Sequence, residues 1–215
     1  RFTSYQKKSR RLVNCIANIM EQFDVVGTAV STKYSGYNLQ MEPCVMSFLD
    51  QEIIEKYLNP QMPNREYFVK ETIAYCKNLS AQNITYIFSM DGLLHFLETG
   101  NIRELSQDIY IRPALEDRVK IIERILHPEG GQKVKILKQK IGHPETDVNI
   151  LVTSEHGLLR VAVPAKNIFL DMILEESGVL YSFYDFCENL GNVMFYGQEE
   201  AERLVLEHAK MLQCE

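Results

Sequence analysis

Cysteine is scarce in this 215-residue chain, and its cysteines are never closely paired. The five cysteines are an odd number and stand far apart, at positions 15, 44, 76, 187 and 214. No two of them have the spacing of a zinc knuckle or of a redox-active pair. Because disulfides are rare in the reducing cytoplasm, this usage predicts free thiols and a cytoplasmic protein.

Long hydrophobic runs are also missing. Charged residues interrupt every apolar stretch well short of the roughly 18 residues that a spanning helix needs. The chain also lacks a charged start followed by an apolar signal region. We therefore expect no membrane partner.

Positive charge is in short supply. The chain has 23 Lys and Arg against 29 Asp and Glu, a formal net charge of −6. Binding to nucleic acid depends on neutralising phosphates with basic side chains. We therefore do not expect the chain itself to contact DNA.

The common catalytic and cofactor motifs are absent. There is no His-Glu-x-x-His pair, no Gly-x-Ser-x-Gly elbow and no glycine-rich phosphate loop after a strand. None of the five histidines is spaced from another like a pair of metal ligands. We therefore predict no catalytic residues, no metal site and no cofactor.

The most informative stretch runs from Asn83 to Gly100. Its first part, Ile84 to Met90, is a compact apolar run typical of a buried strand. Asp91 is then expected to cap a short helix, and Gly100 to end it in the left-handed conformation. A strand followed by a helix N-terminus is where α/β folds collect ligands.

Helical and strand periodicities alternate along the rest of the chain. Apolar residues at helical spacing predict helices at 8–23, 43–58, 66–79, 113–126, 179–190 and 198–213. Alternating or compact apolar runs predict strands at 24–32, 38–41, 133–140, 148–153, 158–163 and 168–174, with 148–163 as a hairpin. The fold class is therefore α/β, a mixed sheet with flanking helices, in a single domain over residues 1–215.

Two segments of the chain resemble each other. Ala29-Val-Ser-Thr-Lys33 recurs as Ala162-Val-Pro-Ala-Lys166, and Ser47-Phe-Leu-Asp50 recurs as Ser182-Phe-Tyr-Asp185. These matches suggest an internal duplication of residues 24–80 and 148–213 around a central unit at 83–140. If the matches reflect common descent, two similar α/β halves are related by a pseudo-twofold axis.

Three stretches of the second half carry a family resemblance: residues 110–126, residues 180–190 and the helix that begins at Gln198. In these stretches the chain resembles the C-terminal effector region of Firmicute helix-turn-helix transcriptional regulators. It implies a DNA-binding module upstream of this chain, and the basic start at Arg1 fits a cut just after one. DNA would then be a partner only through that module. The resemblance implies no ligand and no site residue.

These features predict a sensory, ligand-binding or dimerisation domain of a cytoplasmic bacterial regulator. We expect a small-molecule ligand and a homodimer, without catalysis. The candidate ligand-binding residues are polar groups at ends of predicted elements: Ser89, Asp91, His95, Glu42, Arg112 and Glu176. Two alternatives stay open. One is a small hydrolase-like enzyme with a groove near Asp91 and His95, or near Glu42 and Glu176. The other is a protein–protein adaptor.

Overall fold

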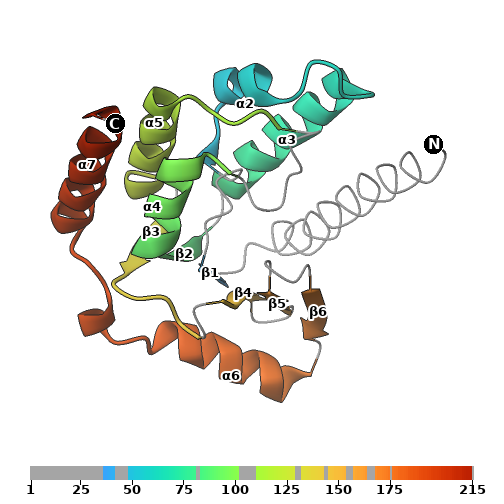
Figure 1. Cartoon of the computed structure of the whole chain (residues 1–215). Helices are drawn as coiled ribbons and strands as arrows, with labels where there is room; N and C mark the ends of the chain where they lie inside the picture. The colour runs from blue at the N-terminus through green and yellow to red at the C-terminus, as the bar shows by residue number, and fades with distance from the viewer. Residues whose placement is uncertain are drawn as a thin grey trace.

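The fold is built on one mixed sheet with helices on both faces. The computed structural model describes residues 36–41, 48–80, 83–101, 110–128, 132–142, 145–153, 157–163, 168–174 and 176–214. Figure 1 shows the helices and strands of this part of the chain. The predicted α/β class, a mixed sheet with flanking helices, is confirmed.

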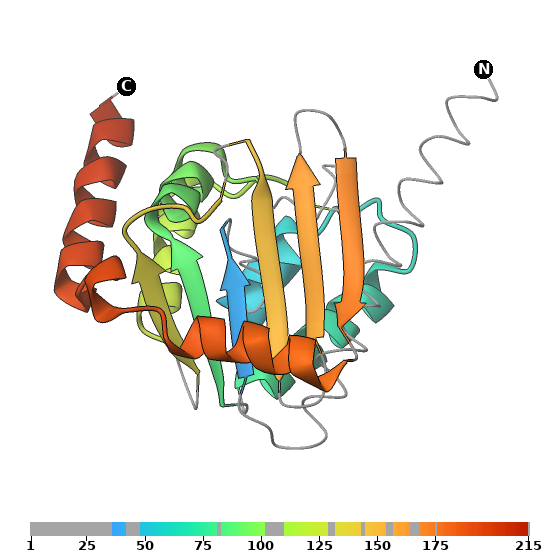
Figure 2. The same ribbon diagram turned by 90° about the horizontal axis from the view of Figure 1, so that it is seen from below.

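The sheet has six strands in the order β3-β2-β1-β4-β5-β6 (Figure 2). Three of them are parallel: β1 (Gly36–Gln40), β2 (Ile84–Ser89) and β3 (Lys133–Leu137). Three follow as an antiparallel meander: β4 (Asp147–Thr153), β5 (Gly157–Val163) and β6 (Ile168–Leu174). Since β4 is antiparallel to β1, the carboxyl ends of the parallel strands and the start of β4 meet at one end of the sheet.

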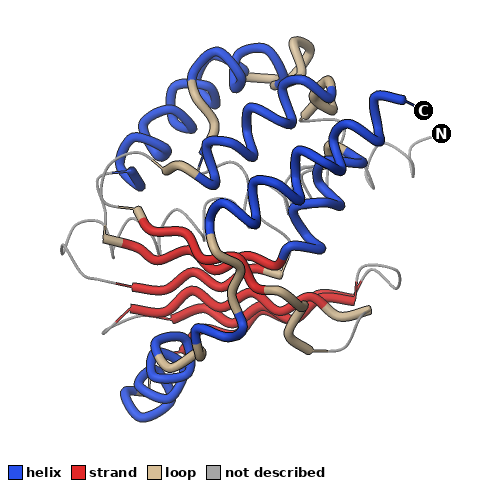
Figure 3. The backbone as a smooth tube through the Cα atoms, turned by 90° about the vertical axis from the view of Figure 1, so that its left-hand side faces the viewer, coloured by secondary structure: helices blue, strands red, loops and turns tan. Residues whose placement is uncertain are grey.

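The helices are distributed unequally over the two faces (Figure 3). One face is covered by α2 (Gln51–Tyr57), α3 (Arg65–Ser80), α4 (Met90–Thr99), α5 (Leu115–Leu126) and α7 (Gln198–Cys214). Of the described helices, α6 (Ser177–Glu188) covers the other face, and the short 3-10 helix η3 (Asn192–Met194) leads from it to α7.

Strand alternation divides the apolar residues between two cores. In β2, Ile84, Tyr86 and Phe88 belong to the core under the larger helical layer. Ile87, between them, belongs to the core under α6 together with Leu39 of β1. Successive side chains of a strand point to opposite faces, so a compact apolar run is the pattern that a strand covered on both sides requires.

Several predicted boundaries are confirmed and three are wrong. Gly100 ends α4 with a φ of 63°, in the left-handed region, as predicted. Asp91, however, does not cap α4, because the side chain of Ser89 takes that role. The helix predicted over 43–58 begins at Gln51, where Asp50 accepts a hydrogen bond from Ile53 N. Strand β3 ends at Leu137 rather than at position 140.

Other predictions fall outside the described residues. The helix at 8–23 and the strand at 24–32 belong to this group, and so does part of the first proposed repeat, 24–80. The internal duplication with its pseudo-twofold relation therefore stays a prediction.

Candidate functional site

The carboxyl ends of the three parallel strands lie at the same end of the sheet, and each strand is followed by a segment that turns over that end. These segments are Met41 after β1, the first turn of α4 after β2, and the connection 138–142 after β3. In α/β folds this carboxyl edge is the usual place for a ligand, because several loops converge there.

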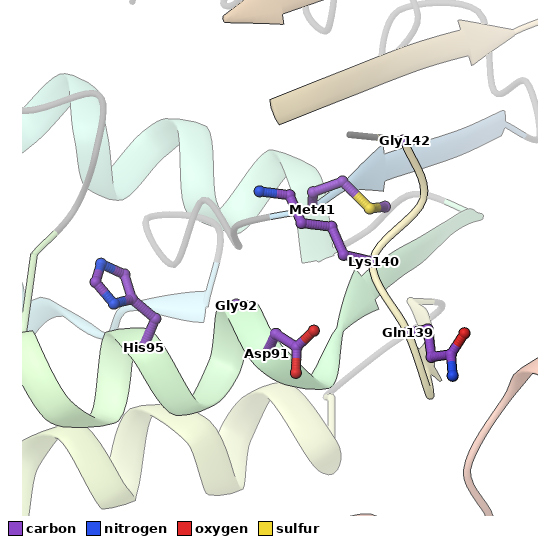
Figure 4. A pocket seen from close by; sticks show the side chains of 7 residues that line it. All are labelled: Met41, Asp91, Gly92, His95, Gln139, Lys140 and Gly142. Carbon is purple, nitrogen blue, oxygen red and sulfur yellow. The ribbon is translucent and has the colours of Figure 1, made fainter. Parts of the chain in front are cut away.

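A pocket of about 430 Å³ lies between these segments (Figure 4). Its lining includes four polar side chains and comes from all three segments: Met41, Asp91, Gly92, His95, Gln139, Lys140 and Gly142. This volume is within the range of about 300–1,000 Å³ that is typical of small-molecule sites. We refer to these seven residues as the carboxyl-edge pocket.

Ser89 lies beneath the pocket and does not line it. Its hydroxyl donates to the carbonyl oxygen of Met41 at 2.5 Å and accepts from Gly92 N at 3.0 Å. Ser89 therefore joins the ends of β1 and β2 and starts α4 at the same time. Because it is fully buried, the expectation that Ser89 borders the pocket is wrong.

Asp91 and His95 both line the pocket, as the sequence suggested. They are four residues apart on α4, a spacing that places both side chains on one side of a helix. Both are exposed. In the described part of the chain no hydrogen bond or ion pair joins the carboxylate to the imidazole, so both groups face the pocket separately.

Lys140 reaches over the pocket from the connection after β3 (Figure 4). Its ammonium lies 2.5 Å from Oδ1 of Asp147, and the two side chains are 19% and 3% exposed. The connection is held over β1 because Ile141 N donates to Met41 Sδ at 3.0 Å. Next to it, Gly142 has a φ of 98°, which a residue with a side chain rarely adopts. The strand predicted over 133–140 included Lys140 as its last residue, so the place of this side chain over the pocket was not predicted.

A row of polar residues crosses the sheet beside the pocket. Gln40 is opposite Asn149, Asn149 is opposite Arg160, and Arg160 is opposite Asp171. Gln40 and Arg160 are both only 7% exposed. Leu39 and Ile150 point into the α6 core, so the adjacent Gln40 and Asn149 belong to the opposite face. Buried polar groups cost free energy unless they are hydrogen-bonded, so such a row is unusual inside a sheet.

The remaining candidates do not join the pocket. Arg112 is exposed and precedes Pro113, which contacts Gly100 at the far end of α4. That helix has 10 residues, a length of about 15 Å. Glu176 is the N-cap of α6 and follows β6. Strand β6 runs opposite to β1, so it ends at the opposite end of the sheet, where β1 begins. Glu42 lies outside the described residues.

A second buried carboxylate lies between α2 and α5. Asp117 is 5% exposed and accepts hydrogen bonds from Lys56 at 2.5 Å, from the hydroxyl of Tyr57, and from Lys120 at 3.4 Å. The bonds from Lys56 and Tyr57 lower the pKa of Asp117 to about 2. The Tyr57 oxygen also accepts from Ala114 N at 3.2 Å, next to the start of α5. This cluster connects the two helices and does not border the carboxyl-edge pocket.

In the described part of the chain, no three His, Cys, Asp or Glu side chains gather closely enough to hold a metal ion. Among the same residues, no helix has the length and apolarity required to cross a bilayer.

Comparison of the chain with models of known families, with curated proteins and with solved structures gives no match. The case for a function therefore rests on the pocket and on its chemistry.

Proposed function

We propose that this chain is the sensory domain of a cytoplasmic bacterial transcriptional regulator and binds a small polar molecule in the carboxyl-edge pocket. The observation that carries the proposal is the meeting of three segments, from the ends of three parallel strands, around one cavity that four polar side chains border. The negative charge of the chain and the resemblance of its second half to regulator effector regions support the same function.

The lining favours a ligand that both donates and accepts hydrogen bonds. Asp91 offers a carboxylate, Gln139 offers an amide, and Lys140 offers an ammonium group that already neutralises Asp147. An apolar ligand would remove water from the Asp91 carboxylate and the Gln139 amide without replacing its hydrogen bonds, which costs free energy. A small molecule with polar groups on more than one side fits this chemistry better.

The regulatory mechanism would be a shift between populations of conformations. A ligand that touches α4 and the 138–142 connection together would stabilise the arrangement in which both close over the end of β1. In a full-length regulator this arrangement would favour one placement of the upstream DNA-binding modules. DNA would be contacted by those modules and not by this chain.

The hydrolase alternative is less well supported. Asp91 and His95 share the pocket, but the hydroxyl of the nearby Ser89 points into the sheet, bonded to Met41 O. A nucleophile must be exposed and within hydrogen-bond reach of its base, and Ser89 is neither. The adaptor alternative stays a prediction, since exposed apolar side chains such as Ile173 and Tyr181 would suit a protein partner.

The proposal is tested by thermal unfolding with a panel of small polar molecules: amino acids, sugars, nucleotides and dicarboxylic acids. Any compound that binds only the folded state raises the melting temperature with its concentration. Native mass spectrometry of protein purified from its source would report a retained molecule directly. We expect at least one compound to give a saturable rise in melting temperature.

Matched variants locate the binding. Lys140→Gln and Asp91→Asn should remove the rise, whereas Lys210→Gln on the exposed side of α7 should keep it. A rise that survives both pocket variants would place the ligand elsewhere. The absence of any binding compound and of any retained molecule would count against a sensory function.

A further inference from the structure

The two edges of the sheet are finished in different ways. At the β3 edge the chain covers itself, because Phe195 forms a β-bridge with Leu137. Lys138 N donates to Met194 O and Tyr196 N donates to Ile136 O, both at 2.8 Å. The outer backbone groups of β3 are therefore partly satisfied by the segment that follows η3.

The β6 edge lacks such a cover. Strand β6 is last in the strand order, and in the described part of the chain no strand or bridge lies on its outer side. Three of its apolar side chains are exposed: Leu170 by 56%, Met172 by 47% and Ile173 by 68%. Edge strands of monomeric proteins usually carry charges or bulges that prevent pairing with other chains. This edge is seven residues long and carries one charged residue, Asp171.

The exposed residues of β6 lie on both faces of the sheet. Leu174 is buried in the α6 core, and strand alternation places Leu170 and Met172 on that same face. Ile173 belongs to the opposite face. A helix laid on one face would cover only one of these sets and would leave the outward backbone N–H and C=O groups unpaired. A strand paired alongside β6 would cover both sets and bond the backbone.

We propose that β6 is the interface of a homodimer, in which the β6 strands of two copies pair antiparallel and join the two sheets into one. A twofold axis perpendicular to the sheet would keep like faces on the same side, so Met172 of one copy would meet Met172 of the other and Leu170 would meet Leu174. A register centred on Met172 would also keep the two Asp171 residues from facing each other, which avoids repulsion between like charges.

The start of α6 extends this surface. A side chain added at Gly157 would touch both Leu180 and Leu174. These two leucines therefore lie beside each other at the end of β6. The next residue, Tyr181, is 70% exposed. Figures 1 and 2 show the first turns of α6 beside the end of β6. The dimer would therefore bury an exposed aromatic residue of each copy near the paired strands. This inference does not depend on the carboxyl-edge pocket.

The test is the mass of the chain in solution as a function of concentration, measured by light scattering after size-exclusion chromatography and by native mass spectrometry. The wild-type chain should have twice the 24.9 kDa of one copy. Met172→Lys places a charge on the pairing edge and should shift the dimer to monomer, with at least a tenfold weaker association. Met211→Lys on α7 makes the same chemical change at a side chain that is 57% exposed and should leave the dimer intact.

Circular dichroism and thermal unfolding show whether each variant is folded. If Met172→Lys does not fold, hydrogen exchange of the wild-type chain decides instead, since amides of β6 should be better protected at high than at low concentration. A wild-type chain that is monomeric at every concentration would overturn the proposal. It would favour another occupant of the edge, such as the strand predicted at 24–32. A dimer that survives Met172→Lys would overturn the proposal as well.

Discussion

In the described part of the chain, two buried aspartates each accept a lysine ammonium at 2.5 Å, and the two pairs are built differently. Asp117 is met by Lys56 and Lys120, whose side chains are 53% and 65% exposed, so the cations reach in from solvent. Asp147 is met by Lys140, which is only 19% exposed. The first pair lies between helices and the second borders the carboxyl-edge pocket.

The same kind of ion pair therefore stabilises the fold in one place and borders a candidate site in the other. The Asp117 pair is completed by Tyr57, which is also bonded to the start of α5, so its hydrogen bonds mainly connect elements of the fold. The Asp147 pair instead places a cation on the wall of a cavity, where a ligand would meet it. Removing groups from the two pairs should therefore have different consequences.

The largest effect on stability should come from Asp117→Ala. The change leaves the buried Tyr57 hydroxyl without its acceptor and removes the contact from α5 to α2, which should cost about 2–3 kcal/mol of unfolding free energy. Urea denaturation measures this loss, with Glu116→Ala on the same helix as the control. A loss no larger than that of the control would show that the cluster is not structural.

Acid should weaken the same pair. The folded pKa of Asp117, about 2, lies below its ordinary value of 3.8, so the pair stabilises the fold fully above pH 4 and loses this contribution as pH falls toward 2. Allowing for screening of the exposed lysines, the contribution is about 1–2 kcal/mol. Urea denaturation across this pH range should show a steeper loss for the wild-type chain than for Asp117→Asn. Equal slopes would contradict the assignment.

The two lysines give the most direct contrast between the pairs. Lys140→Met leaves Asp147 buried with one partner fewer, which should cost about 1–2 kcal/mol and also abolish stabilisation by any pocket ligand. Lys56→Met should cost less stability, because Lys120 still contacts Asp117, and should leave ligand binding unchanged. Calorimetric unfolding with and without ligand measures both effects. If the two variants lost ligand binding equally, the distinction between scaffold and site would fail.

The smallest effect on stability should come from His95→Ala. His95 is exposed on α4 and lines the pocket, so its removal should change the unfolding free energy by less than about 0.5 kcal/mol. If the pocket binds a ligand, affinity should nevertheless fall several-fold, which a titration followed by thermal unfolding would detect. His127→Ala, at the end of α5 and outside this pocket, is the matched control. A variant that binds as tightly as the wild-type chain would remove His95 from the site.

Local sequence patterns anticipated much of the described fold. The apolar run from Ile84, the periodic helix after Pro113 and the hairpin over 148–163 were all recognised, because each pattern involves residues close together in the chain. One error occurred where two neighbouring residues compete for one role. Ser89 and Asp91 are both good helix caps, and the hydrogen bond from Ser89 to Met41 O, a contact across 48 residues, accompanies the choice of Ser89.

The candidate site was anticipated only in part. Asp91 and His95 were found because the strand–helix junction is a local signal, but Gln139 and Lys140 carry no pattern that marks them. Their place in the pocket follows from strand order, which sets β3 next to β2 and sends the connection after β3 back over β1. The Lys56–Asp117 pair, 61 residues apart, has the same origin.

The sequence by itself thus determined the fold class, the position of most elements and one wall of the pocket, since hydrophobic periodicity and helix-stop signals act over a few residues. Only the tertiary structure decided which of two buried lysine–aspartate pairs borders a cavity, which edge of the sheet the segment after η3 covers, and which polar residues face one another. Those outcomes depend on strand order and register, and these are set by contacts between residues that the sequence keeps far apart.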